Sequence, residues 1–155
     1  AKVDFQVYSD TGILVHSDAP NHSVGIGKND PSASFMLDVI ADATTGGSIN
    51  SAGWLALSTN DTRTGAGAVG VTTPVTFLSN SSGASALTIG NGTNGQIKIL
   101  VCTVMDGGSM AFTSQSNIQL GGGGTTLTFD SVGETAILMY VNSKWQLLAG
   151  TAAVS

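Results

Sequence analysis

Three residues near the N-terminus could hold a metal ion. His16, Asp18 and His22 lie close together in the sequence, and transition metals accept imidazole and carboxylate ligands. Their spacing matches no standard zinc motif. Two interpretations stay open, a metal site and two histidines that meet by chance in a turn. The motif evidence alone predicts no metal site, and these three residues are the candidates if one exists.

Two glycine-rich segments have the composition of phosphate-binding loops. Residues 90–95 (GNGTNG) have the spacing G-x-G-x-x-G, but residues 96–105 (QIKILVCTVM) follow, which is typical of a strand. A dinucleotide loop needs a helix there, because the helix N-terminus binds the pyrophosphate. Residues 121–124 (GGGG) lack the Lys-Ser/Thr of a P-loop. We therefore expect turns at both segments, and no cofactor.

The candidate acid–base and nucleophilic groups do not form a recognisable catalytic pattern. Asp38 and Asp42 are four residues apart, as are Asp130 and Glu134, but that spacing has no geometric meaning near strand ends. No G-x-S-x-G nucleophile elbow occurs in the sequence. The single cysteine, Cys102, lies in an apolar run, which favours a buried structural thiol. We expect no catalytic residues and no enzymatic activity.

Composition excludes two further classes of function. The 155 residues carry a net charge of −5, and only 10% of them are charged. The five Lys and Arg residues are scattered, so binding to nucleic-acid phosphates is not expected. No apolar run reaches the roughly 18 residues of a spanning helix, and the start lacks a signal-peptide pattern. Ala1 fits removal of an initiator Met, which predicts a complete gene product.

Short apolar runs that alternate with glycine-rich turns predict an all-β protein without long helices. We expect an antiparallel sandwich or jelly-roll-like domain, preceded by an N-terminal β arm. The predicted division is residues 1–50, the arm or a small β module, and residues 51–155, the sandwich. Residues 59–70 are polar and glycine-rich, which predicts a loop. Asn142 and Ser143 are placed at the tip of a hairpin, and Trp54 and Trp145 are predicted to be core residues.

The strand predicted over residues 96–105 is apolar on both faces. One row holds Ile97, Ile99, Val101, Thr103 and Met105, and the other holds Lys98, Leu100, Cys102 and Val104. A strand with two apolar faces is typical of the middle of a sandwich or of a contact between subunits. We take Leu100, Cys102 and Val104 as candidate residues of a subunit interface.

Several segments resemble known phage proteins. Residues 23–39 (SVGIGKNDPSASFMLDV) resemble the VGIG…NPS…LDV element of phage tail fibres and related virion proteins. A second group resembles β-rich modules of small structural proteins of tailed phages, marine ones especially: residues 64–71, 86–98, 126–129, 136–140 and 144–148. The resemblance implies a homotrimer without enzymatic activity, and it transfers no catalytic residue.

The resemblance leads us to expect a structural protein on the virion surface, made in the host cytoplasm. The main hypothesis is a trimeric capsid decoration (cement) protein that binds the major capsid protein and stabilises the shell. Chain length favours it, because a fibre needs a long shaft. The alternative is a receptor-binding tail-fibre or spike-tip module that recognises a host surface glycan through residues 60–70 or 121–124. Capsid and tail locations both stay open.

Overall fold

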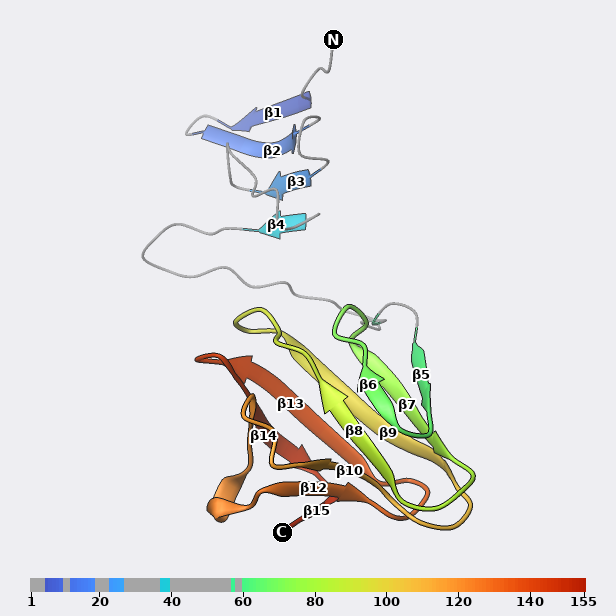
Figure 1. Cartoon of the computed structure of the whole chain (residues 1–155). Helices are drawn as coiled ribbons and strands as arrows, with labels where there is room; N and C mark the ends of the chain where they lie inside the picture. Colours follow the sequence, from blue (N-terminus) through green and yellow to red (C-terminus); the bar gives the residue numbers. More distant parts are fainter. Residues whose placement is uncertain (1–4, 10–11, 19–22, 27–36, 40–56, 58–59) are drawn as a thin grey trace. The chain divides into compact units, whose positions relative to one another are not determined.

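The structure is a computed structural model that describes residues 5–9, 12–18, 23–26, 37–39, 57 and 60–155 (Figure 1). These residues form strands and one short 3-10 turn, with no α-helix among them. The prediction of an all-β protein is therefore confirmed. The chain divides into two compact units, Ala1–Leu55 and Ala56–Ser155. We call them the first unit and the second unit.

The first unit contains a four-stranded sheet with the strand order β1-β2-β3-β4. Its strands are β1 (Phe5–Ser9), β2 (Gly12–Asp18), β3 (Ser23–Ile26) and β4 (Leu37–Val39). The first three strands pair antiparallel, and β4 pairs parallel to β3. Trp54 lies outside the described residues, so its predicted place in a core stays a prediction.

The first part of the second unit is a stack of three rungs, each contributing one strand to each of two sheets. The chain alternates between the sheets through β5 (Asp61–Thr64), β6 (Gly67–Val69), β7 (Val75–Asn80), β8 (Ser85–Ile89), β9 (Ile97–Met105) and β10 (Met110–Thr113). Within each sheet, successive rungs pair parallel. Phe77 lies beside Val101 in one sheet, and Ala86 lies beside Ala111 in the other. This stacking is that of a short solenoid.

The remaining strands close one end of the stack. They are β11 (Ile118–Gln119), β12 (Thr126–Phe129), β13 (Thr135–Val141), β14 (Lys144–Gly150) and β15 (Ala153–Val154), with the 3-10 turn η1 (Gly121–Gly123) before β12. β12 and β13 pair antiparallel to β10 and β9 of the last rung. The result is a six-stranded sheet, β11-β14-β13-β9-β7-β5, and a five-stranded sheet, β15-β12-β10-β8-β6.

This strand pairing contradicts the prediction of an antiparallel sandwich or jelly roll. The rungs pair parallel, and antiparallel neighbours occur only in the closing part of the second unit. The cause lies in the turns, because each short connection after a strand carries the chain into the opposite sheet. Alternating hydrophobicity predicts which residues face inward, but not which strand lies alongside. Residues 59–70 were wrongly predicted to be a loop, since β5 and β6 lie within them.

The core lies between the two sheets of the second unit. Every second residue of β7 and β13, and of β9 up to Cys102, is buried on one side, and the same holds for β8, β10 and β12 on the other. The largest buried apolar side chains are Trp145, Phe112, Phe129, Leu78, Leu87, Leu100, Met110, Leu127 and Leu138. A buried Leu or Phe contributes about 1.5–3 kcal/mol relative to an exposed one, so this set is the main source of stability.

Buried polar contacts join successive rungs at their turns. The fully buried Asn80 donates from Nδ2 to the carbonyl oxygens of Gly83 (2.7 Å) and Ser109 (3.4 Å). Ser85 donates its backbone N–H to the same Ser109 oxygen (2.7 Å) and its hydroxyl to Asn80 Oδ1 (3.2 Å). Gly108, at φ 94°, packs so closely on the Gly83 backbone that a Cβ would overlap it. Asn80 and Gly108 together set the spacing between two rungs.

The predicted hairpin at residues 142–143 is confirmed. Asn142 and Ser143 have positive φ values of 50° and 64°, as a tight two-residue hairpin requires. Trp145, the second residue of β14, is fully buried, which confirms its place in the core. Its ring packs edge-on against Tyr140, with the centroids 5.1 Å apart, and its Nε1 donates to the Gly90 carbonyl oxygen at 2.8 Å. The turn predicted at residues 90–95 is thereby tied to the core.

Candidate functional site

The three metal candidates are not all covered by the described residues. His16 and Asp18 lie in β2, where His16 pairs with Gln6 of β1 and Gly25 of β3. His22 lies outside the described residues. Within the described part of the chain, no three His, Cys, Asp or Glu residues come together as metal ligands could. The metal site at His16, Asp18 and His22 stays a prediction.

The acidic pair Asp130 and Glu134 is part of a turn. Glu134 Oε2 accepts hydrogen bonds from the backbone N–H of Asp130 at 2.7 Å and of Ser131 at 3.2 Å. This carboxylate therefore holds the connection between β12 and β13. Of the other pair, Asp38 lies in β4 and Asp42 lies outside the described residues.

The thiol of Cys102 is buried in the core and 1% exposed. Burial raises its pKa, and the negative charges of Glu134 and Asp130 raise it further. A thiol is a good nucleophile only as the thiolate. Cys102 is therefore an inert packing residue in this fold.

Lys98 is an unusual charge, because its side chain is fully buried in the inner row of β9. Its Nζ donates to the Thr73 carbonyl oxygen (2.7 Å), the Thr73 hydroxyl (3.3 Å) and the Thr76 hydroxyl (2.6 Å). Burial lowers its pKa to about 8, and the carboxylate of Asp61 opposes that shift. Three acceptors already satisfy the ammonium group, so Lys98 binds the Thr73 turn to the core.

Two of the three candidate subunit contacts on β9 lie in the core of the same chain. Leu100 is fully buried and Cys102 is 1% exposed. Val104, the third candidate, is 38% exposed and available for a contact with another molecule.

The opposite row of β9 belongs to a continuous apolar surface. Ile99 lies beside Val75 of β7 and Ile137 of β13, and Ile97 lies beside Met139. Ile97 is 44% exposed, and most of the others are half-buried. We call this part of the outer side of the six-stranded sheet the apolar face, and define it by Val75, Phe77, Ile97, Ile99, Val101, Ile137, Met139, Val141 and Leu148. Polar residues border it, with Thr62 of β5 beside Phe77 and Gln146 of β14 beside Met139. None of these residues is charged, and Lys144 lies at its corner, paired with Val141.

The outer side of the five-stranded sheet differs in composition. Its outward residues are alanines and threonines, which we call the small-residue face: Ala68, Ala86, Thr88, Ala111, Thr113, Thr126, Thr128 and Ala153. Pairing aligns them in rows, with Ala86 beside Ala111 and Thr113 beside Thr126. A shallow groove of about 240 Å³ crosses this face near Ala86 and Ala111. The face carries no charge and no large side chain.

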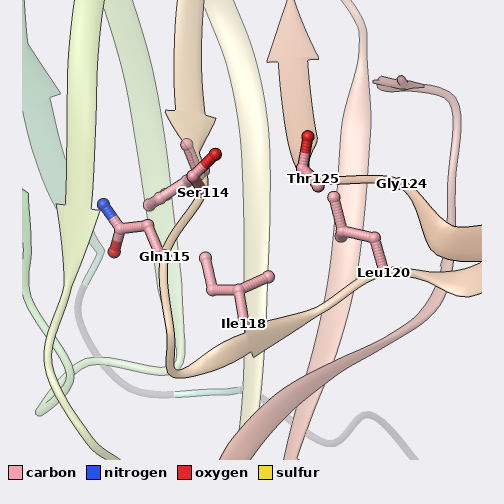
Figure 2. Close-up of a pocket in the computed structure, with 7 residues that line it drawn as sticks. Ser114, Gln115, Ile118, Leu120, Gly124 and Thr125 are labelled. Carbon is pink, nitrogen blue, oxygen red and sulfur yellow. The ribbon is translucent and has the colours of Figure 1, made fainter.

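A pocket of about 280 Å³ lies beside the glycine turn η1 (Figure 2). Phe112 and Leu120, both buried in the core, line it together with Ser114, Gln115, Ile118, Gly124 and Thr125. Figure 2 shows Ser114 and Thr125 at the adjacent ends of β10 and β12, with Ile118 and Leu120 on the side of β11. The Ser114 N–H donates to the Thr125 carbonyl oxygen at 2.7 Å, which holds the two sides together.

The chemistry of this pocket suits a small neutral ligand. Its lining contains no charged side chain, and it offers two hydroxyl groups over an apolar base. Gln115 is engaged elsewhere, because its Nε2 donates to the Leu87 oxygen (2.7 Å) and its Oε1 accepts from the Ile89 N–H (3.2 Å). The volume lies just below the range of about 300–1,000 Å³ for pockets of drug-sized ligands. A single sugar ring is the largest ligand we expect it to enclose.

Comparisons with protein-family models, with curated proteins and with solved structures return no match for this chain. Within the described residues, no helix is long and apolar enough to cross a membrane. Sequence reasoning identified residues 121–124 as a possible binding loop but missed the pocket, because its lining comes from β10, β11 and the start of β12. It also missed the apolar face, which requires knowing that β7, β9 and β13 are neighbours.

Proposed function

We propose that this chain is a structural protein of the phage exterior, a homotrimeric capsid decoration protein. The single observation that carries the proposal is the uncharged character of both outer faces of the second unit. Neutral surfaces cost less to desolvate than charged ones, so such faces suit a protein whose role is to be covered by neighbours. The sequence resemblance of residues 23–39 and 86–98 to virion proteins supports the same role.

In this role the two units have different tasks. The second unit associates with further copies through one of its neutral sheet faces. The first unit contacts the major capsid protein, and its edge strands β1 and β4 can extend a sheet of that partner. Each trimer then links neighbouring capsid subunits and stabilises the shell mechanically. No enzymatic step belongs to this role, and the described thiol, lysine and acidic turn have the packing roles given above.

A second candidate, a receptor-binding tail-fibre or spike-tip module, is favoured by the pocket beside η1. A neutral sugar ring of a host surface glycan would donate to, and accept from, the hydroxyls of Ser114 and Thr125. Its apolar side would pack on Ile118. Binding of the full chain to an array of bacterial glycans, lost in Ser114→Ala with Thr125→Val, would support this candidate over decoration.

The number of copies per virion decides between the two roles. Quantitative mass spectrometry of purified particles, calibrated against the major capsid protein, measures it directly. Hundreds of copies are expected for a decoration protein, whereas tens or fewer indicate a tail appendage. Absence of the chain from purified particles would reject both.

A further inference from the structure

We propose that three copies of this chain associate around a three-fold axis through the apolar face. The inference rests on the proposed function for the trimeric state, and it adds the surface that makes the contact. That surface replaces the inner row of β9, which the core of the same chain already covers.

The face is continuous and matches the largest apolar patches of soluble monomers in area. Three neighbouring strands contribute its centre, with Val101 beside Phe77 and Ile99 beside Ile137. Ile97 and Leu148 extend it, at 44% and 55% exposure. Four strands at about 4.8 Å spacing and six residues at about 3.3 Å each give an area of about 400 Å². Apolar patches of this size are among the largest on soluble monomers and are often functional.

The charge distribution favours another copy as the occupant. The whole chain carries a net charge of −5, so two copies repel one another unless they meet through an uncharged area. The apolar face is such an area, because Asp106 follows β9, and Asp130 and Glu134 lie in the connection between β12 and β13. A strongly basic or acidic partner has nothing to pair with on this face. A partner of the same chemistry, which is the face itself, is complementary to it.

The available area favours three copies over two. A face-to-face pair buries about 800 Å² in total, well below the roughly 1,200–2,000 Å² of stable specific interfaces, whereas three faces bury about 1,200 Å². Three sheets about 19 Å wide, built from strands about 4.8 Å apart, enclose an axis about 5.5 Å from each sheet. Side chains of the size of Ile, Met and Phe can fill that space.

The test compares one variant on each face of the full chain. Light scattering coupled to size-exclusion chromatography, at micromolar concentration, measures the mass of wild type, of Ile97→Lys with Ile99→Thr, and of the matched control Thr88→Lys. Thr88 is an exposed, outward residue of β8 on the small-residue face. We expect a trimer for wild type and control. For the apolar-face variant we expect a monomer with an unchanged circular dichroism spectrum.

Each other outcome overturns a defined part of the inference. A variant that stays trimeric places the contact elsewhere, and leaves the trimer of the proposed function intact. A wild-type dimer overturns the three-fold arrangement. A wild-type monomer overturns both the trimer and this contact.

A cysteine cross-link decides the case in which the apolar-face variant does not fold. Ile97→Cys alters an exposed position only, and the native Cys102 is buried and does not compete. Mild oxidation is expected to link two copies of Ile97→Cys by a disulfide, seen as a dimer band on a denaturing gel. Thr88→Cys, treated identically, is expected to stay a single chain. The reverse pattern, or no link at Ile97→Cys, overturns the inference.

Discussion

The two outer faces of the second unit differ far more than the two inner faces that they cover. Inward, both sheets present large apolar residues, such as Leu100 on β9 and Leu87 on β8. Outward, the six-stranded sheet presents Ile, Val, Met and Phe at its centre with Thr62 and Gln146 beside them, whereas the five-stranded sheet presents only Ala and Thr. The fold requires the inner rows, but it leaves the outer rows free. The difference outside therefore indicates that the two faces do not share one role.

The largest expected effect tests the claim that the inner rows are equivalent. Leu100→Ala and Leu87→Ala are each expected to lower the free energy of unfolding by about 2–5 kcal/mol, because each leaves a cavity in the shared core. Urea denaturation followed by circular dichroism measures both. A cost below about 1 kcal/mol for one of them would show that its sheet is not packed on the core.

The next effect concerns the turn that sets the spacing of the rungs on both faces. Gly108→Ala forces a Cβ into the backbone of Gly83 and is expected to cost about 2–4 kcal/mol, a value typical of backbone strain and overpacking. The matched control is Gly95→Ala, since Gly95 has a similar φ of 84° but no neighbour near its Cβ. Thermal unfolding measures the loss of stability in both variants. Equal losses would mean that φ alone, and not rung stacking, determines the cost.

A smaller effect follows from the buried lysine in the inner row of β9. The pKa of Lys98 is lowered from 10.5 to about 8 by burial. Between these two values the unfolded chain keeps a proton that the folded chain releases. The free energy of unfolding therefore rises with pH in this window, by about 1–3 kcal/mol for a shift of this size. Below pH 8, Lys98 adds no pH dependence to the free energy of unfolding.

Denaturant titrations at pH 7.5 and pH 10 measure this rise, and Lys98→Met is the control. Lys98→Met removes the titrating group, so the free energy of unfolding of this variant is expected to rise less between the two pH values. An identical pH dependence in both proteins would mean that Lys98 keeps its proton when folded.

The smallest expected effect lies on the small-residue face. Thr88→Lys replaces an exposed strand residue that contacts no core side chain, and we expect a change within about 0.5 kcal/mol. Thermal unfolding checks this, and the same variant is the control for the trimer contact. A loss above about 1 kcal/mol would show that this face is packed as well.

Local patterns predicted the strands well because burial alternates along each of them. The strand over residues 96–105, the Asn142–Ser143 tip and the buried Trp145 were all identified from neighbouring residues alone. The pairing of strands could not be identified in this way, since β7 and β9 lie about 24 residues apart and nothing local specifies that they are parallel. Asn80 was overlooked for a similar reason, because its partners Gly83 and Ser109 belong to two different turns.

The inner and outer rows of β9 cannot be told apart from the sequence for a physical reason. Both rows are apolar enough to be buried, and the single lysine is the only discriminating residue. A lysine is usually solvated, so Lys98 by itself would indicate the outer side. The acceptors of Thr73 and Thr76 reverse that expectation, and they come from a segment 22 to 25 residues earlier in the chain.

The parallel rungs also make the length of the second unit adjustable in whole steps. A duplicated copy of a rung, such as residues 81–105, would present the same edge to its neighbour as the original. Gene duplication could thus lengthen the molecule by about 4.8 Å per rung, the distance between paired strands. The closing strands β12 to β15 would stay unchanged at the end of the stack. In a protein of this design, the number of rungs sets the length of the molecule, and its cross-section stays the same.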